Sequence, residues 1–545
     1  MKRTNHIKTI MKAMKLTLFI SCAVLIFFSC KKDFTQLNPL DSLSEGTAFS
    51  DPSRIELVAN GMYQQAAIGV YDAGTGAGAG RGYPFGGASI EQAEMRGEDM
   101  VNLATFYQIT YQATYSASSA NNKNHWEQLY SLINQANVLI EGARNAGQSG
   151  ILDQSVADSY EGEGRFMRAL SYHELLIHFC RPYSDNPTKN LGVPWRDKAI
   201  NSPTAVQDAY NVDRGTVAAT YQNILADLDW AEQHLPETNP HGAARVRKGA
   251  AIALKTRVKL FMQDWPGVIS EGAKLGTDAT SGTFSSPISG FILEADPKAP
   301  FTNYSGSKES IFSVAQSAAS NGGVNGALAA MLSPASTAAS PSAGRGLVAI
   351  SPNLYNAPFF TTTDKRRGLM VQQATSPKIW FTNKYWDYTT RSNWSPIMRY
   401  SEVLLNVAEA KARVGGTDNI NSAFMLLNAV RNRSVDIADR YASVPADLIL
   451  AILNERRIEF SAEGRRWPDI QRLSQDPLYG LNSIPAKILP SQIKGDGSDY
   501  NLTTRPTITP GFASIPYSDF RFVWPIASSE INANPILRSQ QNPGY

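Results

Sequence analysis

The densest group of charged side chains in the chain lies between residues 454 and 469. Within it, Glu455, Glu459 and Glu463 are four residues apart, so a helix would present all three on one face. Two carboxylates held in this way could act as the general acid and general base of a glycosidase. Carboxylates at this spacing also repel one another unless cations lie between them. Four arginines are interspersed with them: Arg456, Arg457, Arg465 and Arg466. We therefore interpret the group as an ion-pair network at a helix end, with a surface glycosidase as the alternative.

Residue types that bind metals are scarce, with six histidines and three cysteines in 545 residues. His173 and His178 are five positions apart, which puts them about 140° apart around a helix and prevents both from binding one ion. Cys22, Cys30 and Cys180 form no Cys-x-x-Cys pair. The sequence therefore predicts no metal site, no cofactor and no disulfide in the exported protein.

The glycines between residues 69 and 87 could form a phosphate-binding loop. Neither G-x-G-x-x-G nor G-x-x-x-x-G-K-[ST] occurs among them, and no convincing strand precedes them. We also expect no helix to begin there, so backbone amides at a helix N-terminus would not be available to an anion. A flexible loop is the favoured interpretation.

Aromatic side chains are concentrated in two segments that lack helical periodicity. Sugar rings have apolar C–H faces that stack on aromatic planes, while their hydroxyls need polar partners at the rim of the site. The alternative is that each ring packs in the core of a short hairpin. From their positions in these segments, we predict that four rings contact a ligand: Tyr83, Tyr107, Trp386 and Trp394.

Helical periodicity dominates the elements that must position these residues. Apolar stripes predict helices that begin at Asp51, run through 126–140 and 166–180, and cover 217–234 and 245–275, the last broken near Pro266. Three more are expected at 397–414, 420–433 and 447–463. Small residues alternate with large ones in these pairs, a texture similar to tetratricopeptide units. Residues 69–123 and 276–396 are irregular, and we expect the binding face to be built there.

The first thirty residues have the pattern of an export signal. Five cations in residues 1–15 precede an apolar run from Leu16 to Phe28, which is too short to span a bilayer. The run ends in Ser29-Cys30, which resembles the lipobox of bacterial lipoproteins. We therefore expect a signal peptide over 1–29, a lipid on Cys30 and a tether over 30–46, with an ordinary cleaved signal as the alternative.

Removing that signal changes the charge of the protein. The whole chain has 51 basic and 48 acidic side chains, and the signal holds five of the basic ones. The mature chain therefore has 46 basic and 48 acidic side chains, so its formal charge is 46 − 48 = −2. A near-neutral chain gives no support to a nucleic-acid partner or to membrane attachment by charge.

The order of several motifs resembles the SusD/RagB family of nutrient-binding surface lipoproteins from Bacteroidetes. The motifs are the lipobox at Cys30, residues 164–172 followed by Phe179 and Pro182, residues 398–405, residues 427–433, the 455–457 cluster, and the ending from 522 to 545. The resemblance implies a mainly α fold: a SusD-like α-α superhelix with tetratricopeptide-like helix pairs and a loop-rich ligand-binding face with a few short strands. It divides the mature chain into an N-terminal region at 47–240 and a C-terminal region at 241–545 that form one compact body.

The same resemblance implies what the protein does. Family members bind nutrients without catalysis, and they cover a SusC-like TonB-dependent outer-membrane barrel as a lid. The expected location is the outer membrane, lipid-anchored and facing the cell exterior. The expected ligand is an oligosaccharide or polysaccharide. Peptide capture, a surface glycosidase and a purely structural repeat scaffold are the alternatives.

Overall fold

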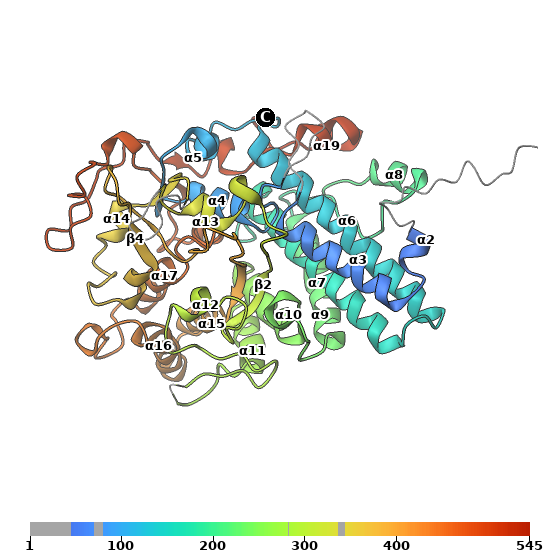
Figure 1. Ribbon diagram of the computed structural model, residues 1–545, viewed down its shortest axis with the longest axis horizontal. Coiled ribbons are helices and arrows are strands. Elements are labelled where there is room, and N and C mark those ends of the chain that lie inside the picture. The colour runs from blue at the N-terminus through green and yellow to red at the C-terminus, as the bar shows by residue number, and fades with distance from the viewer. Residues whose placement is uncertain (1–44, 70–79, 282, 336–343) are drawn as a thin grey trace, which may run out of the picture.

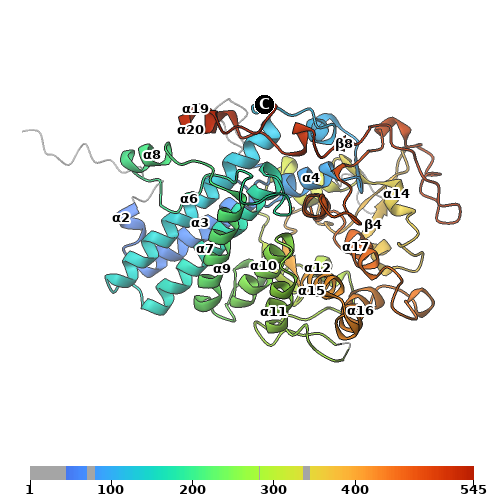
Figure 2. The same ribbon diagram turned by 180° about the vertical axis from the view of Figure 1, so that it is seen from behind.

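The computed structural model describes residues 45–69, 80–281, 283–335 and 344–545, which form a mainly helical body (Figure 1). Six helices on one side lie next to each other in both views (Figures 1 and 2). They are α3 (Pro52–Ala67), α6 (Ala120–Gln148), α7 (Gln154–Phe179), α9 (Val217–His234), α10 (Lys248–Phe261) and α11 (Trp265–Lys274). The predicted helices at 126–140, 166–180 and 217–234 are thus confirmed. Their apolar stripes pack against one another in one continuous core.

Local capping explains where several of these helices begin. The Asp51 carboxylate accepts hydrogen bonds from the backbone N–H groups of Ser53 and Arg54 at the start of α3. The Thr216 hydroxyl caps α9 in the same way by accepting from Ala219. Asp264 caps α11 by accepting from Gly267, and Pro266 follows in the first turn. The predicted break between α10 and α11 is therefore confirmed.

Four later helices extend the body: α15 (Tyr400–Val414), α16 (Thr417–Asn432), α17 (Leu448–Glu459) and α18 (Arg466–Leu473). Helix α15 packs against α10 and α11, α16 and α17 pack against α15, and α18 packs against α4 (Gly87–Arg96) and α7. The prediction of a helix from 397 is wrong for its first residues. Ser395–Arg399 form strand β6, which pairs with β2 (Ser310–Val314), and the helix begins at Tyr400. The pairing satisfies backbone groups that a helix would otherwise have used, and all five strand residues are buried.

The first glycine-rich stretch also differs from expectation, because α4 (Gly87–Arg96) begins at its end. Every residue of α4 is buried, including Glu91, Gln92 and Glu94, so the helix has no polar face for sequence periodicity to reveal. The backbone N–H of Gly87 donates to Gly326 O, and that of Ser89 donates to Gly82 O. The Gly87 and Ser89 amides at the start of α4 are thus occupied by carbonyls, and residues 70–79 of the stretch lie outside the described residues.

The strands of the described residues form four antiparallel pairs, each of two strands. Besides β2 and β6, they are β1 (Met100–Asn102) with β3 (Val348–Ile350), β4 (Met370–Gln372) with β5 (Trp380–Thr382), and β7 (Ser483–Ile484) with β8 (Ile515–Pro516). Short helices occur among them: α2 (Glu45–Ala48), α5 (Gln108–Tyr111), α8 (Pro203–Ala209), α12 (Ala299–Thr302), α13 (Leu328–Leu332), α14 (Pro352–Tyr355), α19 (Ser528–Ala533) and α20 (Pro535–Arg538).

A second core lies beneath these strands and loops, distinct from the core of the long helices. It contains α4 and α13 residues together with Val348, Phe381 and Tyr385. The loop-rich side of the molecule is therefore built on its own apolar support. The fold confirms the predicted class, a mainly α body with a few short strands on an irregular side.

Two further observations concern the membrane and the cysteines. None of the helices in the described ranges is both long enough and apolar enough to cross a membrane. Cys180 is buried and free, with the guanidinium of Arg214 at 3.8 Å from its sulfur. The predicted signal, Cys30 and most of the tether precede residue 45 and lie outside the described residues.

Candidate ligand-binding face

The candidate ligand-binding face is formed by four segments: residues 80–87, 103–109, 316–326 and 386–394. Contacts between side chains and backbone groups link each segment to the next. Gly87 N–H donates to Gly326 O, and a Cβ on Gly82 would lie 2.6 Å from that same oxygen, so only glycine fits this crossing. The side-chain amide of Asn321 donates to Thr390 O at 3.3 Å. The loops of both irregular regions therefore meet at one surface.

Two of the predicted aromatic residues lie on this face with accessible rings. Trp386 is 43% exposed, and its indole Nε1 donates to Phe301 O at 3.0 Å. Trp394 is partly exposed, and its Nε1 donates to Gln316 O at 3.1 Å. Each indole is held at its polar edge while part of its ring remains accessible. Such anchoring fixes an aromatic plane at little entropic cost to a ligand that stacks on it.

The other two predicted residues are differently placed. Tyr83 is 3% exposed and Tyr107 is 2% exposed, and both rings belong to the second core. The Tyr83 hydroxyl accepts a hydrogen bond from the side-chain amide of Gln92. Neither ring offers a face on which a ligand could stack, so burial removes both from the residues that we propose for ligand contact. Their loop positions in the sequence carried no information about this burial.

Sequence reasoning did not select Phe106, which lies on the face beside two cations. The guanidinium carbons of Arg81 and Arg345 lie 5.2 and 4.9 Å from the Phe106 ring centroid. The ring is partly exposed and packs edge-on against Tyr107. Cations at this distance are attracted by the ring face. Three segments distant in sequence thus converge on one aromatic side chain, and no local pattern could have revealed this.

The carboxylates from the 455–463 cluster are buried and paired with cations. Glu459 contacts Arg366, Arg399 and Arg433 at 2.8–2.9 Å, while Glu463 contacts Arg399 and Lys384. These cations hold the pKa of Glu459 well below its ordinary value in spite of burial, so it remains ionised and is unsuited to donate a proton. The ion-pair interpretation agrees with this geometry.

A cavity beside Glu463 is too small to admit a sugar. Its volume is about 30 Å³, and its lining includes Glu174, Arg257, Glu463 and Arg465. This volume is close to that of one water molecule. Glu174 and Glu463, which both line this cavity, therefore have no room for a glycan substrate between them.

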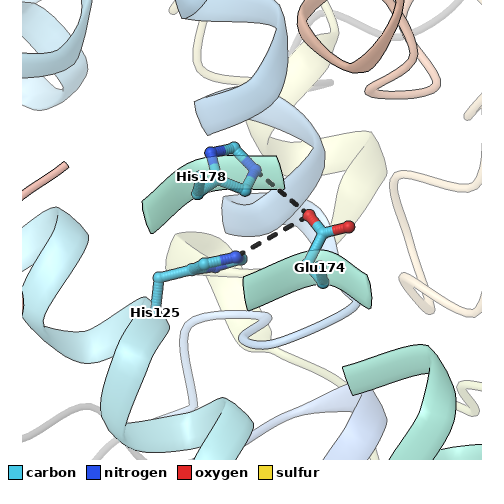
Figure 3. A group of neighbouring side chains, drawn as sticks. All are labelled: His125, Glu174 and His178. Carbon is cyan, nitrogen blue, oxygen red and sulfur yellow. Dashed lines mark hydrogen bonds and ion pairs between the residues drawn. The ribbon is translucent and has the colours of Figure 1, made fainter. Parts of the chain in front are cut away.

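A second polar cluster, which sequence reasoning missed, lies between α6 and α7 (Figure 3). His125 from α6 points toward Glu174 and His178 from α7, and Nε2 of the two histidines lies 3.7 and 3.2 Å from the same Glu174 oxygen. Both imidazoles are buried. The sequence signal for this cluster is the i, i+4 spacing of Glu174 and His178, which places both side chains on one face of α7.

The spacing of these three side chains is close to that of a zinc site, in which ligand atoms are about 3.4 Å apart. Arg96 argues against a cation there. Its Nη1 lies 3.4 Å from Nδ1 of His178, and a guanidinium can only donate. Nδ1 is then the accepting nitrogen, and Nε2 carries the proton and donates to Glu174. A metal would need that same Nε2 deprotonated, beside a buried positive charge. Within the cluster, His178 and Glu174 form a hydrogen bond inside α7, and His125 from α6 packs against them with its Nε2 at 3.7 Å from the Glu174 oxygen.

His173 provides a test of burial in the same helix. It is 1% exposed and packs against Phe261, and burial, together with the charge of Arg257, lowers its pKa to about 3. The unfolded chain binds a proton near pH 6.5, so stability is lost as pH falls below that value. At pH 5 the loss is about 2 kcal/mol. We expect His173→Leu to reduce the difference in unfolding free energy between pH 7.5 and pH 5 by about this amount in urea titrations.

The control for this measurement is His241→Leu, because the His241 side chain is 46% exposed. It should leave the pH dependence unchanged. A His173→Leu protein with the same pH dependence as the parent would contradict the assignment.

Comparison with known proteins places this geometry in a family. Residues 355–545 match the model described as the SusD family, and residues 72–260 match the model described as starch-binding associating with outer membrane. A crystal structure of a SusD superfamily protein from Bacteroides fragilis superposes with a TM-score of 0.71 at 26% identity, covering 90% of this chain and 99% of that one. The chain belongs to the SusD superfamily.

Two other SusD-like proteins extend the comparison. SusD-like protein P2 of Formosa agariphila is 24% identical over 401 residues, which is 66% of this chain and 73% of that protein. A laminarin-binding SusD-like protein shares the fold, with a TM-score of 0.65 at 20% identity, covering 91% of this chain and all of that one. The resemblance to the SusD/RagB family is thus confirmed. The matched descriptions characterise the superfamily as carbohydrate-binding and associated with the outer membrane.

Proposed function

We propose that this protein is a non-catalytic cell-surface lipoprotein that binds oligosaccharide or polysaccharide nutrients. It delivers them to a SusC-like TonB-dependent transporter in the outer membrane, which it covers as a lid. Support comes from membership of the SusD superfamily and from the laminarin-binding protein that shares its fold. Peptide capture by the same uptake system is the alternative.

The observation that carries the proposal is the anchored and exposed indole of Trp386 on the looped face. Trp394 lies in the same segment, and the ring of Tyr304 packs 5.9 Å from it. The surrounding loops supply amides and hydroxyls from Asn321, Asn325 and other small polar residues. An aromatic plane with neutral polar groups around it matches the two surfaces of a sugar ring, its C–H face and its hydroxyl rim. We therefore propose Trp386 and Trp394 as stacking residues.

The lack of catalysis is supported by the carboxylates already described. The Glu455, Glu459 and Glu463 side chains are buried and engaged with arginine or lysine. Glycoside hydrolysis needs two carboxyl groups on opposite sides of a bound substrate. The cavity that Glu463 lines in the described part of the chain, of about 30 Å³, is too small to hold one.

The binding experiment uses the purified protein in affinity electrophoresis and calorimetry. The probes are laminarin, other neutral glucans, acidic polysaccharides and a tryptic peptide mixture. We expect saturable binding to a glycan without release of reducing ends. Binding to peptides alone would replace the glycan proposal with peptide capture, and release of reducing ends would restore the glycosidase.

The lipid anchor at Cys30 is a separate proposal, supported by the Ser29-Cys30 sequence after the apolar run. Several acyl chains on one residue suffice for stable attachment. Cells grown with a palmitate analogue should label the parent protein, and Cys30→Ala should abolish both the label and membrane retention. Cys180→Ala is the matched control, because Cys180 is buried and should not affect the label. Label that persists in Cys30→Ala would rule out this anchor.

A further inference from the structure

The cations beside Phe106 suggest which glycans the looped face prefers. Nη1 of Arg345 donates to Asn325 Oδ1 at 2.8 Å and to Val324 O at 3.4 Å, and it lies 3.7 Å from the Met331 sulfur. All of these partners are neutral. Within the described ranges, Arg345 has no carboxylate within ion-pair distance. The guanidinium is thus held in a fixed position while its charge stays uncompensated by direct contact.

The carboxyl group that interacts electrostatically with Arg345 is Glu91, which lies within α4 and is fully buried. Burial raises the pKa of Glu91 well above its ordinary value, although the charge of Arg345 opposes the shift. Neither Glu91 oxygen has a hydrogen-bond partner in the described part of the chain. An unpartnered buried carboxyl group takes up a proton and becomes neutral. Burial therefore favours the neutral form of Glu91, which weakens its compensation of the Arg345 charge.

Two of the segments around Phe106, residues 100–122 and 316–344, carry no charged side chain. In the 386–394 segment, the Asp387 carboxylate accepts hydrogen bonds from the backbone N–H groups of Thr390 and Ser392, which lower its pKa and keep it charged within its own turn. Among the described residues, the charged groups that lie over the Phe106 ring are the guanidinium groups of Arg81 and Arg345.

A guanidinium held in place by neutral partners is suited to bind an anionic group. Guanidinium pairs with carboxylates and with sulfate-like oxyanions through two parallel N–H donors. Near Trp386, such an anion would be carried by a sugar that stacks on the indole. Neutral glycans can stack there too, but they gain nothing from the charge.

We propose that this face selects glycans that carry an acidic substituent, a uronate carboxylate or a sulfate ester, and that Arg345 is the residue that recognises it. The proposal rests on the proposed glycan-binding function and names the substrate class of the same site. Phe106 positions the cation, and Trp386 provides the stacking surface.

Calorimetry with paired probes tests the proposal. The pairs are an alginate oligosaccharide with its carboxyl-reduced form, and a carrageenan oligosaccharide with its desulfated form. In 50 mM NaCl we expect at least one charged probe to bind at least about tenfold more tightly than its neutral partner, with a smaller ratio in 500 mM NaCl because salt screens the contact. The pair that shows the preference identifies the substituent as carboxylate or sulfate.

Variants assign the preference to Arg345. Arg345→Gln should reduce the ratio of the affinities for the charged and neutral probes to below about threefold, and it should leave the affinity for the neutral probe within about twofold of the parent value. Arg345→Lys should retain part of the preference for the charged probe. Arg440→Gln is the control, because Arg440 is exposed and lies between α16 and α17, away from the face. Thermal unfolding checks that each variant is folded.

The outcomes separate this inference from the proposed function. Equal affinity for charged and neutral partners would overturn the inference and leave glycan binding intact. A charge preference that survives in Arg345→Gln would overturn the role of Arg345. A protein that binds no glycan of either kind would overturn the proposed function, and the inference with it.

Discussion

Replacing Arg399 by leucine should lower the free energy of unfolding by about 3–5 kcal/mol, the usual effect of removing one partner from a buried ion pair. Arg399 is 2% exposed, and its guanidinium donates to Glu309, Glu459 and Glu463 at 2.7–2.9 Å. Without Arg399, these three buried carboxylates lose a cation that they share, and the repulsion between them is less compensated. The measurement is urea unfolding followed by near-ultraviolet circular dichroism.

The matched control for this variant is Arg440→Leu, which removes an exposed arginine whose guanidinium donates to Asn432 O. It should change the unfolding free energy by less than about 0.5 kcal/mol. An Arg399→Leu protein that loses less than about 1 kcal/mol would show that the remaining partners, Arg433 and Lys384 among them, compensate fully.

Replacing Trp386 by alanine should weaken glycan binding at least about tenfold, equivalent to about 1.4 kcal/mol. The substitution removes the exposed indole on which a sugar would stack and leaves Phe301 O without its donor. Trp386→Tyr should retain part of the affinity because it keeps an aromatic plane. Affinity is measured by calorimetry with the glycan that binds the parent protein.

The control for the loss is Phe520→Ala. Phe520 is 40% exposed, similar to Trp386, but lies in the C-terminal segment against Tyr545. Its replacement should not alter affinity. Unchanged affinity in Trp386→Ala, with the fold intact, would exclude this indole from the binding surface.

Helices with an amphipathic stripe and a capping residue could be predicted from sequence, and α3 and α9 illustrate this. Asp51 and Thr216 mark the starts of these two helices, and apolar spacing defines their buried faces. The helix α4 could not be predicted in this way, since burial on all sides leaves no periodic contrast. Strand β6 was missed because its apolar residues run directly into α15, and only pairing with the distant β2 distinguishes strand from helix.

The candidate site was less predictable than the fold, because ligand contact depends on which aromatic rings remain exposed. Tyr83 and Trp386 both lie in irregular segments, yet one ring is buried and the other is accessible. The setting of Phe106 depends on Arg81 and on Arg345, 239 positions further along. Local spacing cannot encode such long-range convergence. The order of motifs, in contrast, was sufficient to indicate the SusD/RagB family.

The buried ion pairs at the end of α17 have a mechanical consequence. Glu459 and Glu463 both form ion pairs with Arg399 of strand β6. Glu459 also pairs with the Arg366 guanidinium, and Glu463 pairs with Lys384 in the segment before Trp386. These ion pairs therefore link the apolar core of the long helices to the core beneath the loops. A hinge movement of one core relative to the other would break several of these ion pairs at once. In the proposed lid role, these contacts favour movement of the two cores together as one block.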